Sequence, residues 1–183
     1  QGQEYKDGVL KARSQGVGQV VRRNLDAGIM TSECPDFDNP NRRIQNIVAV
    51  GAGANISFAI TADDTVFAWG NNYRGAAGIG TWAAGKYCAW VVGPLCNKHL
   101  VAISGGTDHS LGLDAAGKVW AWGDNTWGAT GIGGVSGWVT QWTGGIVEPR
   151  QLSIPGRVVK ISAGDFFNAA LDSEGNAYVW GIN

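Results

Sequence analysis

Residues 47–80 read IVAVGAGANISFAITADDTVFAWGNNYRGAAGIG, and residues 100–133 read LVAISGGTDHSLGLDAAGKVWAWGDNTWGATGIG. The two segments align without a gap and are identical at 15 of 34 positions. A shorter third copy, VVKISAGDFFNAALDSEGNAYVWGIN, occupies residues 158–183. A repeat of this length is typical of solenoids, propellers and other repeat arrays, so it decides the fold class. Every copy contains a Trp-Gly pair, and the pairs are 53 and 58 residues apart: Trp69-Gly70, Trp122-Gly123 and Trp180-Gly181.

Apolar residues alternate with polar or small ones in each copy, and this period of two predicts β-strands. In the second copy, Leu111 and Leu113 alternate with Ser110, Gly112 and Asp114. Turn residues then separate this strand from the next one. We therefore expect a β-hairpin in each copy, preceded by a short strand. The expected turns are residues 61–64, 114–117 and 172–175, and the expected preceding strands are 48–50, 101–103 and 159–161.

The strand after each turn carries an aromatic residue, a spacer and a Trp. Residues two apart on a strand lie on the same face of the sheet. We therefore expect these rings to form core between neighbouring sheets. The six residues are Phe67, Trp69, Trp120, Trp122, Tyr178 and Trp180.

The string V-x-x-I-S-x-G…H-S-x-x-L-D-x-x-G-x-V-W-x-W-G-D-N-x-x-G, read from residues 101–128, resembles the repeat of the RCC1 (regulator of chromosome condensation) family. The resemblance covers residues 47–183, about three quarters of the chain. It implies an all-β fold, because the family builds seven-bladed β-propellers. The family's known roles are protein binding: nucleotide exchange on a small GTPase, and inhibition of β-lactamases by a bacterial relative. Pro94 and Pro149, which follow the long connections, also fit this family.

The chain holds three copies of the repeat, with starts near residues 47, 100 and 158. A propeller needs at least about four blades to close. We therefore expect an incomplete RCC1-like propeller of about three blades. The third copy stops at Trp180-Gly181-Ile182-Asn183, within the motif, so we expect an exposed β-edge that something outside these residues completes.

The first 43 residues differ in composition from the remainder. Residues 1–43 hold 13 charged residues and no Trp, whereas residues 44–183 hold 16 charged residues and all nine Trp. We therefore predict an N-terminal arm at 1–43 and a repeat region at 44–183. Apolar residues from Tyr5 to Leu25 come near helical spacing, but Gly8, Gly16 and Gly18 weaken a helix. A short helix and an extended arm both remain open.

Composition and motifs argue against several classes of function. A net charge of −1 provides no global attraction to nucleic acid, and no apolar run is long enough to span a bilayer. Asp108-His109-Ser110 could suggest a catalytic triad, but successive strand residues point to alternate faces. The resemblance instead implies that this His and Ser bond to neighbouring backbone. We expect no enzyme and no cofactor.

The three cysteines leave two interpretations open. Cys88 and Cys96 could form a disulfide in an oxidising compartment, or all three thiols, including that of Cys34, could be free. Metal binding by Cys88, Cys96, His99 and Cys34 is the weaker hypothesis, since their spacing lacks the close pairs of zinc sites. We predict no metal site.

Aromatic residues in the connections after the first two copies give the strongest signal of function. Trp is enriched at interaction hot spots, and loops on a rigid scaffold often carry binding residues. We predict that these residues contact a partner, although they could instead cap the sheets. They are Trp82, Tyr87 and Trp90 in the first connection, and Trp127, Trp138 and Trp142 in the second.

Two functions follow from these features. The first is a non-catalytic extracellular subunit of a filament, pilus tip or phage tail fibre. It would bind protein or glycan through the Trp-bearing loops and assemble with itself or with a larger structure. The second is an intracellular, cytoplasmic RCC1-like regulator with reduced cysteines, which binds a small GTPase or another signalling protein.

Overall fold

The computed structural model describes residues 5–6, 9–10, 46–80, 86–92, 95, 98–133 and 145–182. Blade 1 consists of β3 (Ile47–Ala52), β4 (Ile56–Thr61), β5 (Val66–Gly70) and β6 (Lys86–Val91). Blade 2 consists of β7 (Leu100–Gly105), β8 (His109–Asp114), β9 (Val119–Asp124) and β10 (Gly145–Gln151). Blade 3 consists of β11 (Val158–Ala163), β12 (Phe167–Asp172) and β13 (Ala177–Gly181).

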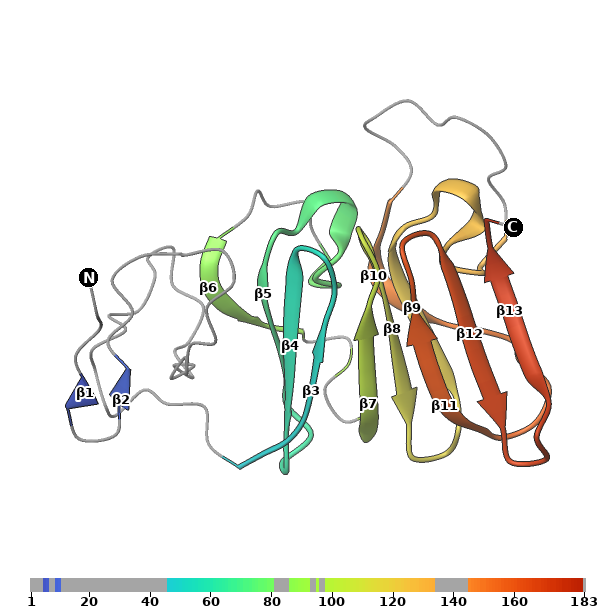
Figure 1. The fold of residues 1–183 in the computed structure, drawn as a ribbon, viewed down its shortest axis with the longest axis horizontal. Helices are drawn as coiled ribbons and strands as arrows, with labels where there is room; N and C mark the ends of the chain where they lie inside the picture. The colour runs from blue at the N-terminus through green and yellow to red at the C-terminus, as the bar shows by residue number, and fades with distance from the viewer. Residues whose placement is uncertain are drawn as a thin grey trace.

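The strands of each blade form an antiparallel sheet, and the three sheets stand side by side (Figure 1). The first strand of each blade contacts the first strand of the next, since β3 contacts β7 and β7 contacts β11. The fold predicted from the sequence, an all-β fragment of an RCC1-like propeller, is confirmed.

The three predicted hairpins are present, and each predicted short strand extends to six residues. Register shifts occur between the first and third residues of these inner strands, so one residue bulges out of each ladder. The bulged residues are Val48, Val101 and Val159. All three are exposed.

A fourth strand, β6 or β10, completes blades 1 and 2, and the sequence patterns did not predict it. Both strands lie within segments that were interpreted as loops. Pro149 lies in β10, where it is tolerated because β10 pairs on one side only, with β9. The register of that pair shifts between Ile146 and Arg150, on either side of the proline.

Two short strands, β1 (Tyr5–Lys6) and β2 (Val9–Leu10), pair near the N-terminus. They include Tyr5 and Val9, two residues of the near-helical pattern. The remainder of residues 1–43 lies outside the described residues, so the N-terminal arm and the domain boundary remain predictions.

Two apolar clusters fill the junctions between blades. The first cluster includes Phe58, Ile103 and Trp122, and it joins blades 1 and 2. The second includes Leu111 and Val158, and it joins blades 2 and 3. As predicted, the strand aromatics Trp120, Trp122, Tyr178 and Trp180 pack into these clusters, whereas Phe67 is buried outside them and Trp69 is half-buried.

Candidate binding face

The Trp of each Trp-Gly pair in blades 2 and 3 closes a junction by a hydrogen bond to the preceding blade. The indole Nε1 of Trp122 donates to the carbonyl of Ala76 at 2.8 Å. The indole Nε1 of Trp180 donates to the carbonyl of Ala129, the equivalent residue, at 3.1 Å. The blade that follows also provides a second donor to each carbonyl. These donors are Ser110 Oγ to Ala76 at 3.1 Å and Asn168 Nδ2 to Ala129 at 2.6 Å.

Glycines in the connections make room for the two indoles. Gly78 and Gly131 have φ angles of +71° and +70°, and a Cβ on either would lie 2.8 Å from the Trp122 or Trp180 ring. Side chains other than glycine are disfavoured there by both the backbone conformation and the contact. The Trp-Gly pair of one repeat and the second glycine of the preceding G-x-x-G therefore form a single contact across the junction.

The connections also form two equivalent 3-10 turns, η1 (Tyr73–Gly75) and η3 (Thr126–Gly128). Arg74 and Trp127 occupy the same position in them, and both have a positive φ, 54° and 61°. Arg74 Nη1 contacts Asp124 Oδ2 at 2.5 Å and Thr126 Oγ1 at 2.8 Å. Asp124 is only 1 % exposed, so this ion pair links blades 1 and 2 inside the structure.

Trp127 differs from Arg74 because it is 40 % exposed. Its turn is fixed by the neighbouring residue, since Thr126 donates to Asp124 Oδ1 from its amide at 2.9 Å and from its hydroxyl at 2.6 Å. The residues of blade 3 that align with Asp108 and Asp124 are Phe166 and Ile182, and Ile182 is 42 % exposed. We use the name Trp127 face for Asp108, Thr126, Trp127, Phe166 and Ile182.

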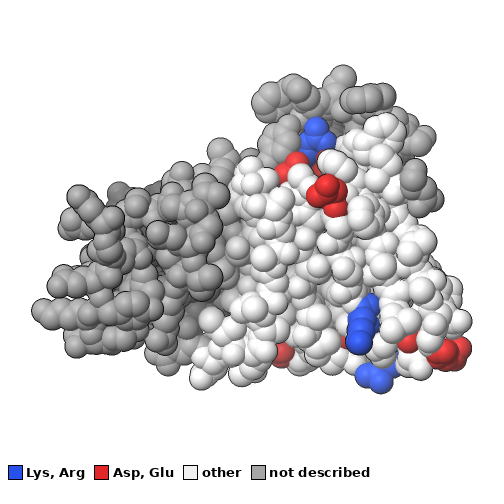
Figure 2. Space-filling model, viewed as in Figure 1, with Lys and Arg blue, Asp and Glu red and all other residues white. Residues whose placement is uncertain are grey.

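Asp108 adds to this face a carboxyl group whose pKa is raised. Its carbonyl accepts a hydrogen bond from the Asp124 amide at 2.8 Å, which places it beside the Arg74–Asp124 pair. Burial raises the pKa of the Asp108 carboxyl, the Asp124 carboxylate raises this pKa further, and Arg74 opposes both. Figure 2 shows charged side chains of both signs at the upper and at the lower part of this view, with a mostly uncharged surface between them.

His109 and Ser110 contact different partners. Ser110 bonds backbone, at Ala76, as the family resemblance implied. His109 does not: its Nε2 lies 2.8 Å from the side-chain Oδ1 of Asn168. Asn168 uses its Nδ2 to donate to Ala129, so its Oδ1 accepts and His109 Nε2 carries the proton.

The buried imidazole is therefore neutral in this arrangement. His109 is fully buried, and its Nδ1 has no hydrogen-bond partner. Burial lowers the pKa of His109, and the Asn168 hydrogen bond and the Asp124 charge only partly offset this effect.

The structure locates three of the six predicted binding aromatics. Trp127 lies on a turn, as expected of a loop residue. Tyr87 and Trp90 lie in β6, where Trp90 is opposite Ala68, so they are strand residues and not loop residues. Trp82, Trp138 and Trp142 lie outside the described residues. The role of all six in binding remains a prediction.

The sequence patterns did not identify Arg74, Asp108, Thr126 or Asp124 as members of one site. One signal was available, because Arg74 and Trp127 align in the two full repeats. An alignment position that holds Arg in one repeat and Trp in the next indicates two different environments. Trp127 was predicted as a binding residue from its residue type, whereas Arg74 was not singled out.

Cys88 lies in β6, whereas Cys34 and Cys96 lie outside the described residues, so the disulfide remains a prediction. Within the described ranges, no three His, Cys, Asp or Glu residues are grouped as a metal site. The same ranges contain no helix that is both long and apolar enough to cross a membrane.

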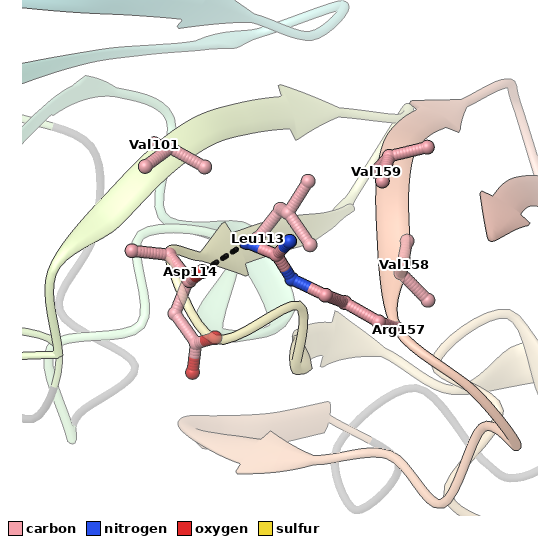
Figure 3. Close-up of a pocket in the computed structure, with 7 residues that line it drawn as sticks. Val101, Leu113, Asp114, Arg157, Val158 and Val159 are labelled. Atoms are coloured by element: carbon pink, nitrogen blue, oxygen red, sulfur yellow. Dashed lines mark hydrogen bonds between the residues drawn. The ribbon is translucent and has the colours of Figure 1, made fainter. Parts of the chain in front are cut away.

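A cavity of about 300 Å³ opens between blades 2 and 3, at the end where the β8–β9 turn lies (Figure 3). Arg157 spans it, and its Nη2 donates to the carbonyl of Ala115 at 3.0 Å. Asp114 also lines the cavity, but its carboxylate already accepts hydrogen bonds from the Lys118 amide at 2.8 Å and from Trp120 Nε1 at 3.0 Å. This cavity is therefore a gap in the junction between the blades, and its two charged side chains are already hydrogen-bonded within the chain.

Two family models match the chain, and both describe the regulator of chromosome condensation (RCC1) repeat. One matches residues 47–76 and 100–128, and the other matches residues 116–171. The chain is similar to the human E3 ubiquitin-protein ligase HERC2, with 32% identity over 138 residues, 75% of this chain and 3% of HERC2. It is also similar to human Protein RCC2, with 29% identity over 140 residues, 76% of this chain and 25% of RCC2. The chain thus spans a quarter or less of the length of these relatives.

Solved structures agree in fold. Yeast RCC1 (Prp20) bound to Kap60 superposes with a TM-score of 0.67 and 23% identity, covering 74% of this chain and 32% of Prp20. A second structure of Prp20p from Saccharomyces cerevisiae, described with its binding properties to Gsp1p and histones, has a TM-score of 0.65 and 23% identity, over 74% of this chain and 33% of Prp20p. Human WBSCR16 has a TM-score of 0.63 and 22% identity, over 79% of this chain and 38% of WBSCR16. Repeat motif, blade architecture and matched models agree, and the chain belongs to the regulator of chromosome condensation (RCC1) repeat family.

Proposed function

We propose that this chain is a non-catalytic protein-binding module of an intracellular regulator, and that a partner protein binds the Trp127 face. Membership of the RCC1 repeat family supports a binding module. The relatives favour the regulator over an extracellular filament, pilus-tip or phage tail-fibre subunit. Self-association and glycan recognition belong to the extracellular hypothesis, and none of these relatives favours them.

The exposure of Trp127 is the observation that carries the proposal. Its indole is 40 % exposed on a turn that Asp124 and Thr126 hold in place, so little conformational entropy is lost when a partner covers it. Trp is the residue most typical of interaction hot spots. Ile182 is also exposed and adds apolar area to the Trp127 face. Phe166, the residue of blade 3 that aligns with Asp108, is a further apolar member of this face.

Asp108 supports a partner that carries a cationic side chain. Burial and Asp124 destabilise the ionised form of its carboxyl, and the positive charge of a Lys or Arg at this point would offset both effects. The same cation could lie against the Trp127 ring, where a cation–π contact contributes about 0.5–1 kcal/mol at an exposed site. Apolar contact and one charge would therefore act together.

The description of the yeast relative supplies two protein probes, Gsp1p and histones. We suggest measuring the binding of each purified probe to the immobilised 183-residue chain by interferometry. Trp127→Ala should weaken the binding of at least one probe by 10-fold or more. Val101→Ala is the matched control, because Val101 is 54 % exposed but lies on inner strand β7. Equal affinity of Trp127→Ala and the wild type, or no binding of either probe, would contradict the proposal.

The intracellular location also makes a prediction about the thiols. Cys34, Cys88 and Cys96 should all be reduced in protein purified from its native cells. Alkylation in denaturant without reductant, followed by mass spectrometry, should then label three cysteines. A Cys88–Cys96 disulfide in such a sample would favour the extracellular hypothesis instead.

A further inference from the structure

The residue before the inner strand of each blade accepts a backbone hydrogen bond from the hairpin turn of its own blade. The three bonds run from the Ala62 amide to the Asn46 carbonyl at 2.8 Å, from Ala115 to His99 at 2.9 Å and from Ser173 to Arg157 at 2.9 Å. His99 and Arg157 then extend their side chains to the turn of the preceding blade. These two residues are therefore equivalent in structure as well as in alignment.

The side chains of His99 and Arg157 meet different residues at the preceding turn. His99 Nδ1 lies 2.6 Å from the Asp64 carboxylate. The residue of blade 2 that aligns with Asp64 is Gly117, which has no side chain. Arg157 crosses this glycine so closely that a Cβ on Gly117 would overlap Arg157 Cγ. The second junction therefore keeps a basic residue at this position and lacks the carboxylate that faces it at the first.

The guanidinium of Arg157 keeps most of its bonding capacity. Arg157 is exposed, and of its five N–H groups one, on Nη2, donates to the Ala115 carbonyl at 3.0 Å. No ion pair of the described residues includes Arg157. Asp114, the acidic residue on the same cavity, is 8 % exposed and accepts hydrogen bonds from its own blade. Arg157 is thus a positive charge that is held in place and has no carboxylate partner among these residues.

The cavity beside Arg157 adds an apolar surface to this charge. Its volume is about 300 Å³, and Leu113, Val158 and Val159 contribute aliphatic side chains to its lining. Leu113 and Val158 are buried, whereas Val159 is 42 % exposed. Figure 3 shows the Arg157 side chain reaching across the cavity towards Leu113, from the side on which Val158 and Val159 lie. A group bound to the guanidinium would therefore also lie close to aliphatic side chains.

The exposed charges around this junction favour an anionic partner. Lys118 follows the β8–β9 turn and Lys160 lies on β11, and both are exposed. Glu174, on the β12–β13 turn, is an exposed carboxylate that opposes them. Asp114 and Asp172 are buried, and their carboxylates accept hydrogen bonds within the chain. Among the described residues of this junction, the exposed charge is therefore mainly positive.

We propose that the cavity between blades 2 and 3 binds an acidic segment of a partner protein, with an Asp or Glu carboxylate on the Arg157 guanidinium and an adjacent aliphatic side chain against Val159. The carboxylate takes the role that Asp64 has at the first junction. Arginine suits this role because its planar guanidinium can donate two parallel hydrogen bonds to one carboxylate. The cavity and Trp127 lie at opposite ends of β9. This second site is therefore distinct from the Trp127 face and does not rest on it.

Two peptides that differ in a single side-chain group test this site. They are acetyl-Ser-Leu-Glu-Leu-Ser-amide and the same peptide with Gln in place of Glu. We suggest titrating each peptide into the isotope-labelled 183-residue chain and following the backbone amides and the Arg157 Nε–Hε signal by NMR. The Glu peptide should produce saturable shifts at residues 113–118 and 157–160. The Gln peptide should bind at least about 3-fold more weakly, because it cannot form the ion pair with Arg157.

A matched pair of protein variants separates the Arg157 site from general surface charge. Arg157→Gln should weaken binding of the Glu peptide by at least about 3-fold and should leave binding of the Gln peptide unchanged. Lys160→Gln removes the same charge from an exposed residue that does not line the cavity. It should leave the affinity within about 1.5-fold of the wild type at physiological salt, which screens exposed charges beyond about 8 Å.

The inference would be overturned by the absence of saturable shifts, by equal binding of the two peptides, or by equal losses in Arg157→Gln and Lys160→Gln. Shifts confined to the Trp127 face, or loss of peptide binding in Trp127→Ala, would assign the peptide to that face and would also overturn it. Sodium acetate, titrated in the same way, tests the aliphatic contact. Acetate binding as tight as that of the Glu peptide would reduce the site to a bare anion contact and exclude a protein segment. No Gsp1p or histone is used, so this result and that of the Trp127→Ala test are independent.

Discussion

The junction between blades 1 and 2 buries Trp122 completely, whereas the junction between blades 2 and 3 leaves the equivalent Trp180 partly exposed. Both indoles donate to the same type of backbone carbonyl. Trp122 also meets Phe58 edge to face, with ring centroids 5.9 Å apart. At the second junction, Leu111 of blade 2 occupies the position that Phe58 of blade 1 occupies at the first. The two junctions thus share the hydrogen bond from a Trp indole to a backbone carbonyl of the preceding blade, while the side chains around it differ.

The charged groups also differ between the two junctions. Arg74 and Asp124 form an ion pair at the first junction, and Asp108 lies beside them. The aligned residues at the second junction are Trp127, Ile182 and Phe166, all of which are apolar. β10 covers the first site, whereas Trp127 and Ile182 are exposed at the second. One position in the repeat therefore holds an ion-paired arginine at one junction and an exposed tryptophan at the next.

Removing the junction indoles should produce the largest change in stability. Trp122→Ala deletes a fully buried indole, its hydrogen bond and its contact with Phe58, and we expect a loss of about 3–5 kcal/mol in the free energy of unfolding. Trp180→Ala should cost less, because its indole is already partly exposed. Urea denaturation of both variants measures the difference. Equal losses would show that the two junctions are equivalent despite their different packing.

The packing of β10 against the 3-10 turn η1 can be tested by a matched pair of glycine substitutions, one in η1 and one in η3. Gly75 and Gly128 have similar φ angles of +81° and +72°, so an alanine at either costs about 1–2 kcal/mol of backbone strain. At Gly75 the new Cβ would also lie 2.9 Å from Val147 Cα, so we expect Gly75→Ala to destabilise the chain by at least 1 kcal/mol more than Gly128→Ala. Thermal unfolding of both variants provides the measurement. A Gly128→Ala variant as unstable as Gly75→Ala would mean that η3 is covered too.

Much of this architecture could be predicted from the repeat. The Trp-Gly register, the period of two and the turn residues predicted three strands per copy, because local patterns determine hairpins. The fourth strands could not be predicted, since β6 and β10 share little sequence. Each forms by pairing with the outer strand of the hairpin, β5 or β9, and this pairing leaves no shared local pattern. Trp127 was predicted to be a binding residue from its residue type, and that role stays a prediction. Arg74 and Asp124 could not be paired from the sequence, because they are 50 residues apart and meet only when blades 1 and 2 pack together.

Acid should weaken the second junction through His109. Its folded pKa is lowered by burial, so below about pH 6.5 the unfolded chain takes up a proton that the folded chain does not. Stability should therefore fall as the pH decreases from 6.5 towards the folded pKa, by at most about 1.4 kcal/mol per pH unit.

His109→Gln keeps an N–H donor for Asn168 and does not titrate, so it should remove this part of the pH dependence. Urea denaturation at several pH values between 5 and 7.5 would compare the variant with the wild type. Parallel curves would contradict the assignment of a buried neutral imidazole. Ile56 occupies the aligned position in blade 1, so the effect belongs to the second junction alone.

The smallest effect is expected at Asp108, beside the ion pair of the first junction. Burial and Asp124 raise the pKa of this carboxyl, so its ionised form weakens the fold at neutral pH. Asp108→Asn should raise the free energy of unfolding at pH 7, by roughly 0.5 kcal/mol because solvent screens a half-exposed group. The gain should shrink as the pH falls towards 4, where the wild-type carboxyl becomes protonated in the folded state first. Thermal unfolding at both pH values checks this, and a loss of stability at pH 7 would mean that Arg74 outweighs Asp124 at this carboxyl.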